Sequence, residues 1–363
     1  MWTAEETGQI RARALELGFD DCRITDASDP ETGSLFREAI AEGRLGEMQW
    51  LARNAEKRLK PELVLPGVRS IVLVAASYGL PEEPDLSPKG SQAPRGTVAR
   101  YACRDDYHDH MGDRLRELAK FLEETGGEGA RALWYVDTGP VLERDLARRA
   151  GLGFVGKHTN LVSRRLGNWI LLGAVLTTVP LLPDTAEPNR CGTCSRCMDA
   201  CPTGAFPRPF VLDARRCIAY LTIELKGSIP LELRPLIGDR IFGCDDCLAA
   251  CPWNRFARES SMLKEGLQPG WRRPDLLAWL ALDEAGFRQT FAGSPILRSK
   301  RRGLLRNVCV ALGNVGDETA LPALVRAAED PEPLIAEHAR WAIGRIRQRM
   351  NSGATTDAAG QPA

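Results

Sequence analysis

The sequence predicts a mixed α/β domain, then a cysteine-rich segment and an all-helical end. Residues 69–78 form a continuous apolar run of strand length, which is typical of a buried central strand. Eight of the 11 cysteines lie between residues 191 and 251. From residue 261 onward, the pattern is that of helices only. We therefore expect an α/β domain at 1–180, a cysteine-rich domain at 181–260, a helical domain at 261–350 and a disordered tail at 351–363.

The first elements follow from local signals. Thr3 begins a capping-box pattern before apolar residues at helical spacing, so a helix should end at Gly18. A short strand follows, in which Cys22 is expected to be a small core residue. Beyond the strand at 69–78, residues 80–96 contain four prolines and are expected to form an exposed loop.

The next stretch places an acid between a strand and a helix. A helix with its apolar face at residues 111–122 should end at Gly126, before a strand at 131–137 and a helix at 141–150. Asp137 stands where that strand ends, which in open α/β sheets is the rim of the active-site crevice. The alternative for Asp137 is a helix N-cap.

A glycine-rich stretch comes next. Gly151, Gly153 and Gly156 match G-x-G-x-x-G, but they follow a helix and not a strand, so we do not expect a dinucleotide site there. Residues 161–177 are expected to form a hairpin that turns near Leu166 to Asn168.

The spacing of the cysteines predicts two iron–sulfur clusters. A C-x2-C-x2-C-x3-C-P motif is followed by a shorter repeat that lacks its first cysteine, and Cys217 is the nearby cysteine that can replace it. In the two-cluster ferredoxin pattern, the fourth cysteine of each motif ligates the other cluster. One 4Fe-4S cluster is then expected on Cys191, Cys194, Cys197 and Cys251, and the second on Cys217, Cys244, Cys247 and Cys201. The alternative is a structural zinc site.

Composition bounds the remaining possibilities. The 48 basic and 48 acidic side chains cancel, so no overall attraction to nucleic acid is expected. The three cysteines outside the motifs do not suit a disulfide framework, which indicates a reducing compartment. No segment reaches about 18 uncharged apolar residues, and the N-terminus does not resemble a signal peptide. We expect a cytoplasmic protein without a membrane partner.

The C-terminal part resembles HEAT-type helical repeats over residues 307–345. At the head of this region, residues 298–306 carry five cations and no acid. Such a run can bind phosphates by charge and by the N–H groups of a helix start. The alternative is a solvated helix face, and we favour phosphate binding because no acid lies within the run.

Five features together resemble the epoxyqueuosine reductase family: the stretches 100–108, 136–144 and 151–160, the offset cysteine set and the HEAT-like end. The resemblance covers residues 1 to about 345. It implies a cobalamin-dependent enzyme that removes the epoxide oxygen of a modified base in the tRNA anticodon loop, in the last step of queuosine synthesis. Two 4Fe-4S clusters would pass electrons to cobalamin from an external low-potential donor.

The resemblance also implies roles for individual residues. Asp137 becomes the proton donor as well as a cofactor contact. Further cobalamin contacts fall on Arg58, Cys103, His158, Thr159, Asn160 and Asp246. The basic run would contact the anticodon stem-loop through Lys300, Arg301, Arg302 and Arg306. The Asp-x-His-x-x-Gly motif that places histidine on cobalt is absent from the sequence. Two rival functions are reductive dehalogenation and electron transfer alone.

Overall fold

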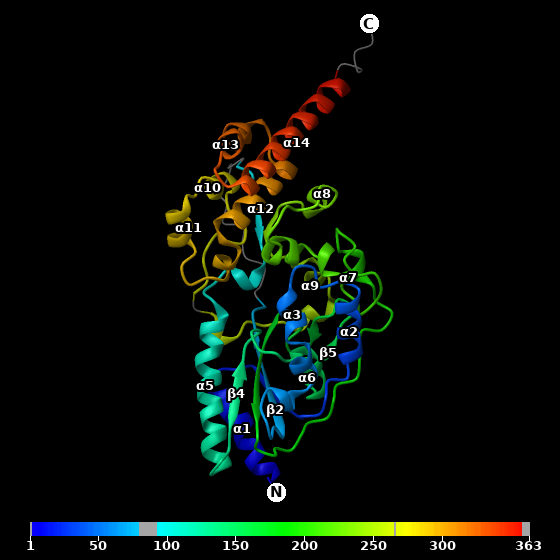
Figure 1. The fold of residues 1–363 in the computed structure, drawn as a ribbon, viewed down its shortest axis with the longest axis vertical. Coiled ribbons are helices and arrows are strands. Elements are labelled where there is room, and N and C mark those ends of the chain that lie inside the picture. Colours follow the sequence, from blue (N-terminus) through cyan, green and yellow to red (C-terminus); the bar gives the residue numbers. More distant parts are fainter. Residues whose placement is uncertain (1, 80–92, 265, 358–363) are drawn as a thin grey trace. The chain divides into compact units, whose positions relative to one another are not determined.

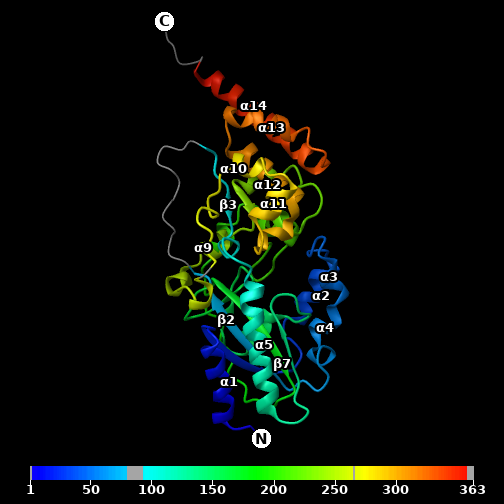
Figure 2. The ribbon, with the colours of Figure 1, turned by 90° about the vertical axis from the view of Figure 1, so that its left-hand side faces the viewer.

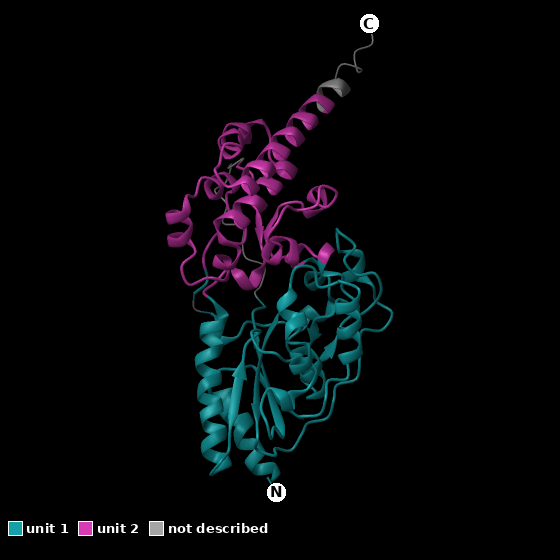
Figure 3. Ribbon diagram, viewed as in Figure 1, with its two compact units in different colours: residues 1–83, 106–214, 246–267 teal, residues 84–105, 215–245, 268–363 magenta. Residues whose placement is uncertain are grey.

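The computed structural model describes residues 2–79, 93–264 and 266–357. The chain divides into two compact units, each made of three segments (Figure 3). Unit 1 comprises Met1–Glu83, Asp106–Ala214 and Asp246–Leu267, and unit 2 comprises Pro84–Asp105, Arg215–Asp245 and Gln268–Ala363. The expected boundaries at 180 and 260 do not coincide with this division, because parts of the cysteine-rich segment belong to each unit.

Unit 1 contains a four-stranded sheet in the order β1-β2-β7-β4. Its strands are β1 (Asp21–Asp26), β2 (Ser70–Ser77), β7 (Ile170–Thr177) and β4 (Ala132–Tyr135). Every residue of β2 is buried, as the sequence predicts for a central strand. All neighbouring strands are antiparallel. The rule that ligands bind at the carboxyl ends of a mainly parallel sheet therefore does not apply here, and Asp137 has to be judged from its own surroundings.

Helices cover both faces of this sheet (Figures 1 and 2). Helices α1 (Ala4–Glu16) and α5 (Tyr107–Gly126) lie on one face, where the absence of a side chain at Gly173 lets Leu115 approach. Helix α6 (Glu143–Arg149) lies on the other face, and Leu146 and Ala147 pack there against Ile71 and Leu73 of β2. The predicted capping box is present at Thr3. Cys22 is a buried core residue, as expected.

The expected hairpin over 161–177 is only partly right. The turn exists, because the backbone groups of Ser163 and Gly167 bond to each other in both directions. Its two arms, however, belong to different sheets: β6 (Leu161–Val162) pairs with β5 (Phe154–Val155), and β7 joins the main sheet. Most of the proline-rich loop expected at 80–96 lies outside the described residues. The shorter helices of unit 1 are α2 (Gly33–Ala41), α3 (Gln49–Arg53), α4 (Ala55–Leu59), α7 (Arg196–Asp199) and α9 (Asp246–Ala249).

Unit 2 is mainly helical. Strand β3 (Thr97–Val98) pairs in parallel with β8 (Arg240–Phe242). Around them lie α8 (Arg234–Ile237), α10 (Leu276–Leu280), α11 (Glu284–Thr290), α12 (Lys300–Val315), α13 (Leu321–Ala327) and α14 (Pro333–Asp357). Helices α12 and α14 pack closely, since a Cβ at Gly313 would lie 2.5 Å from the ring of Trp341.

The C-terminal helix is longer than expected. Helix α14 continues to Asp357, so the tail predicted from residue 351 onward is helical over its first seven residues. Extending an existing helix costs much less free energy than nucleating a new one. A polar stretch that would not form a helix by itself can therefore continue α14. The HEAT-like arrangement itself stays a prediction.

Candidate active site

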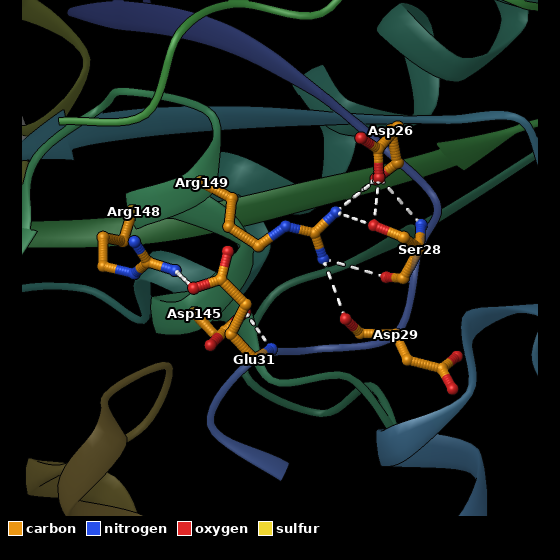
Figure 4. Close-up of polar contacts among 7 residues, drawn as sticks. All are labelled: Asp26, Ser28, Asp29, Glu31, Asp145, Arg148 and Arg149. Carbon is orange, nitrogen blue, oxygen red and sulfur yellow. Dashed lines mark hydrogen bonds and ion pairs between the residues drawn. The ribbon is translucent and has the colours of Figure 1, made fainter.

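Helix α6 is the element on which the site is built, and a buried polar network fixes its position (Figure 4). The buried guanidinium of Arg149 donates to the carbonyl oxygen of Ser28 at 2.8 Å and pairs with the carboxylate of Asp26. From the same helix, buried Asp145 accepts the backbone N–H of Thr32 at 2.9 Å. Buried charges left without such partners would be costly, so these contacts bind α6 firmly to the segment after β1.

Asp137 lies in the turn after β4 and is exposed. Its φ angle is +55°, in the left-handed region that residues other than glycine adopt infrequently. The hydroxyl of Tyr107, at the start of α5, donates a hydrogen bond to Asp137 Oδ2. The N-cap of α6 is Leu142, so the alternative in which Asp137 caps that helix is wrong. An exposed acid held in an uncommon backbone conformation fits a functional role.

Arg58 holds the loop that joins Asp137 to α6. Its side chain is buried, and its guanidinium donates to the carbonyl oxygens of Gly139 at 2.9 Å and Val141 at 3.1 Å. The guanidinium also lies over the ring of Trp50, 5.4 Å from the centroid. Its Nε atom is buried and makes no hydrogen bond with a described residue. The contacts present here position the Asp137 loop, and the predicted contact of Arg58 with the cofactor stays a prediction.

Glu143 begins α6, and sequence analysis gave it no role. The residue as a whole is half-buried, but its Oε1 atom is covered and has no hydrogen-bond partner among the described residues. Burial raises the pKa of the Glu143 carboxyl to about 7, and the charge of Asp137 adds to this rise, while Arg58 and Arg144 oppose it. A carboxyl with a pKa near neutrality beside an exposed acid is typical of functional sites.

The loop between β5 and β6 carries three of the predicted cofactor contacts. The loop is closed by the N–H of Gly156, which donates to Asn160 O at 2.9 Å, and Thr159 has a φ of +66°. His158 is buried, and its Nδ1 accepts the backbone N–H of Asn160 at 3.1 Å. Burial lowers the pKa of His158 to about 4, with a further contribution from Arg144. The ring is therefore neutral near pH 7 and is held within the loop, while Thr159 and Asn160 are partly exposed.

This loop contacts both α6 and the cysteine-rich segment. The guanidinium of Arg144, from α6, donates to Thr159 O at 3.2 Å. On the other side, Lys157 Nζ donates to Cys194 O at 2.8 Å. The predicted cofactor contacts of this loop therefore lie between α6 and the first cysteine motif.

Two further predicted contacts are placed differently. Asp246 is half-buried at the start of α9. The side-chain amide of Asn168 donates a hydrogen bond to Leu248 O of this helix at 3.3 Å. Cys103 is buried in unit 2, with its Sγ 3.5 Å from Ala99 O. The cofactor roles of Asp246 and Cys103 stay predictions.

The four cysteines of the first predicted set all belong to unit 1. Burial raises the pKa of the Cys251 thiol, and the charges of Cys191, Cys197 and Cys194 raise it further, which places all four near one another in unit 1. Among the described residues, no group of three or more histidine, cysteine or acidic side chains is arranged to hold a single metal ion.

The second predicted set is divided between the units. Cys201 and Cys247 belong to unit 1, whereas Cys217 and Cys244 belong to unit 2. The backbone N–H of Ala205 points at the Cys201 sulfur at 3.3 Å, a contact of the kind that stabilises a thiolate. The assignment of this second set stays a prediction.

The basic run at 298–306 has acidic partners that its own sequence does not contain. Arg298 pairs with Glu224 at 2.8 Å. Arg301 pairs with Asp330 at 2.7 Å, and its side chain is only 20% exposed. Acids from distant parts of unit 2 therefore compensate this run in part, contrary to the expectation from its own sequence. Exposed cations in the run include Lys300 and Arg302.

Arg306 is not available to bind a phosphate. It is 1% exposed, and its guanidinium donates to the carbonyl oxygens of Leu221 at 2.6 Å, Leu225 at 2.8 Å and Gly227 at 2.7 Å. The prediction that Arg306 contacts tRNA is corrected accordingly: this side chain fixes the segment 221–227 against α12.

The fold and the cysteine set define a class of protein, in which an α/β unit is combined with an iron–sulfur module. A family model described as a 4Fe-4S double cluster binding domain matches residues 190–254, which include all eight motif cysteines. This match favours iron–sulfur clusters over zinc. A second family model, described as epoxyqueuosine reductase QueG, matches residues 58–138.

Relatives of similar length extend the match. The epoxyqueuosine reductase of Xanthomonas campestris is 43% identical and covers 94% of this chain and 96% of its own. That of Escherichia coli K12 is 39% identical over 95% and 90%, respectively. This protein therefore belongs to the epoxyqueuosine reductase family.

Solved structures of this family resemble both units. An epoxyqueuosine reductase in complex with an epoxyqueuosine-modified stem loop of tRNA-Tyr matches with a TM-score of 0.85 and 33% identity, over 94% of this chain and 90% of its own. The Streptococcus thermophilus enzyme gives a TM-score of 0.85 and 30% identity, over 98% and 94%. A structure of the Bacillus subtilis enzyme, also with a TM-score of 0.85, has its catalytic aspartate loop swung out of the active site.

None of the helices that the structure describes is both long enough and apolar enough to cross a membrane.

Arg306→Ala should lower the free energy of unfolding by about 3 kcal/mol or more, because it leaves the carbonyl oxygens of 221–227 without their charged donor. Lys300→Ala, its control in the same helix, should stay within about 0.5 kcal/mol of wild type because Lys300 is exposed. Urea unfolding measures both. Equal stability of the two variants would contradict the structural role of Arg306.

Proposed function

We propose that this protein reduces epoxyqueuosine to queuosine in tRNA, with Asp137 as the proton donor. The observation that supports this most is the presence in the same unit of an exposed Asp137, held by Tyr107 in a left-handed backbone conformation, and of the first predicted set of four cysteines. The relatives that match over nearly the whole chain bear the name of this activity.

Several residues of unit 1 also fit cobalamin. Arg58 Nε and Asn168 Oδ1 are buried and lack hydrogen-bond partners among the described residues, so each can receive a polar group of a ligand. The partly exposed turn at Thr159 and Asn160 presents backbone and small polar groups to amide arms. When bound, cobalamin supplies reducing power at the epoxide, and an external low-potential donor supplies the electrons through the two clusters.

Asp137 meets the chemical need of the reaction. Opening an epoxide leaves negative charge on its oxygen, and a carboxylic acid within hydrogen-bond reach speeds that step by giving up its proton. Tyr107 and Arg58 hold Asp137 and its loop in place while the substrate binds. The catalytic aspartate loop of the Bacillus subtilis relative moves, and we propose that the loop after β4 is its counterpart in this chain.

For the tRNA, we propose that Lys300 and Arg302 contact the phosphate backbone at the start of α12. They are exposed cations of the basic run, although Arg302 also lies 3.9 Å from Glu332 and donates to Lys226 O at 3.0 Å. Arg301 is mostly covered by its contacts with Asp330 and Leu282. Because tRNA and reduced thiols are found in the cytoplasm, we place the reaction there.

Asp137→Asn should slow conversion of an epoxyqueuosine stem-loop by roughly 10²–10⁴-fold, the range typical of a lost general acid. Iron content and cofactor spectra should not change, because the amide keeps the size of the side chain. Asp109→Asn, at an exposed position in α5, is the control and should behave like wild type. Wild-type turnover of Asp137→Asn would exclude Asp137 as the proton donor.

The ligand assignment predicts about eight irons per chain, as two clusters of four require. Cys217→Ala should reduce this to about four, because it removes a ligand of the second cluster only. Cys309→Ala is the control, since this buried cysteine of α12 is not a predicted ligand. Iron analysis of anaerobically purified protein measures all three. Full iron loading of Cys217→Ala would remove that residue from the ligand set.

Replacing both Lys300 and Arg302 with alanine should weaken binding of the stem-loop and flatten its salt dependence, because each lost phosphate contact removes nearly one unit of the logarithmic slope. Arg326→Ala with Arg347→Ala removes two other exposed cations of unit 2 and serves as the control. Affinity is measured at two or more salt concentrations. Identical slopes for the two double variants would show that Lys300 and Arg302 form an ordinary solvated surface.

A further inference from the structure

Removal of an epoxide oxygen consumes more protons than Asp137 carries. The balanced reaction converts the epoxide, two electrons and two protons into an alkene and water: both carbon–oxygen bonds break, the carbon–carbon double bond forms, and the oxygen leaves with both protons. The external donor supplies the electrons. A single carboxyl gives up one proton, so the site needs a second source.

Glu143 is placed to be that source. It lies at the end of the loop that begins with Asp137, and Arg58 binds the carbonyl oxygens of Gly139 and Val141 between the two acids. Its Oε1 is covered and makes no hydrogen bond to the residues that the structure describes. A covered carboxyl oxygen without a donor is poorly suited to carry a negative charge, so the neutral acid is the form that this position favours.

The charges around Glu143 agree with this geometry. Burial is the main cause that raises its pKa to about 7, and the nearby carboxylate of Asp137 raises it further. The positive charges of Arg58 and Arg144 act in the opposite direction. A hydrogen bond with the backbone of Glu143 itself also lowers the pKa. Below about pH 7 the group therefore holds its proton, and it loses it as the pH rises above that value.

We propose that Glu143 is the proton reservoir of the site, and that its carboxyl reprotonates Asp137 so that the pair delivers both protons that the reaction consumes. This inference rests on the proposed function and extends it. Asp137 touches the substrate, whereas Glu143 acts through Asp137 and through the position of the loop. Afterwards Glu143 regains its proton from solvent, so the site returns to its starting state.

The first test follows single-turnover conversion of an epoxyqueuosine stem-loop by the reduced, cobalamin-loaded protein between about pH 5.5 and 8.5. The wild-type rate should hold below about pH 7 and fall above it, because the reservoir is then empty. Glu143→Gln should be slower at pH 6 by roughly tenfold or more and should lack this fall. Glu124→Gln, an exposed acid of α5, is the control and should keep the wild-type profile. A wild-type fall that survives in Glu143→Gln would overturn the proposal.

A double variant separates a proton relay from a packing effect. If Glu143 acts through Asp137, adding Glu143→Gln to Asp137→Asn should slow the reaction no further. If the two effects simply multiply, Glu143 acts independently of Asp137 and the proposal fails.

The second readout needs neither cofactor nor substrate. The infrared band of a protonated carboxyl should disappear from the purified protein as the pH rises through about 7. In Asp137→Asn the change should persist but occur at a lower pH, because the charge of Asp137 no longer raises the pKa of Glu143, and in Glu143→Gln it should be absent. If no such band titrates, Glu143 is not the reservoir, even if the enzyme converts its substrate. If the band titrates but wild type converts no substrate, the proposed function fails, and with it the reservoir role, although the protonated carboxyl stands.

Discussion

The attachment of α6 to the segment after β1 is the constraint on which the rest of the site depends. Arg149 and Asp145 supply buried charged groups whose partners are mostly backbone atoms of that segment. The helix is short, so isolated it would not be stable, and these contacts together with packing on the sheet hold it. Because α6 cannot shift without breaking them, the residues at its first turn keep fixed positions.

The first turn of α6 connects to two loops of the site, the Asp137 loop and the loop between β5 and β6. Glu143 feels the charge of Asp137, while Arg144 holds the loop between β5 and β6 by its contact with Thr159. Lys157 of the same loop contacts the first cysteine motif. Through neighbouring residues, the first turn of α6 is thus connected both to the loop of the proposed proton donor and to the loop that contacts the first cysteine motif.

The sequence predicts those features that depend on local spacing. The cysteine motifs are such a case, since ligand identity follows from intervals of two or three residues. The same holds for the central strand and the capping box at Thr3. Features that depend on distant partners were missed or misjudged. Arg301 appeared to have no acidic partner because Asp330, with which it pairs, lies 29 residues further along the chain. Arg306 was expected to be exposed, whereas its guanidinium donates to three backbone carbonyl oxygens.

The same reason explains the omission of Glu143 and Tyr107. Both stood within recognisable motifs, but nothing in their spacing tells that one would be covered and the other bonded to Asp137. The burial of Glu143 and the contact of Tyr107 with Asp137 arise only when the chain has folded. The burial raises the pKa of the Glu143 carboxyl. The antiparallel order of the sheet was likewise inaccessible from the strands taken singly, since each reads the same in either direction.

The most direct test of this account is a structure of the cobalamin-loaded protein with an epoxyqueuosine stem-loop bound. The account predicts that the epoxide oxygen lies within hydrogen-bond distance of the Asp137 carboxyl, about 2.6–3.2 Å, with Tyr107 and Arg58 still holding Asp137 and its loop. An epoxide oxygen bound away from Asp137, with that carboxyl facing solvent, would contradict it.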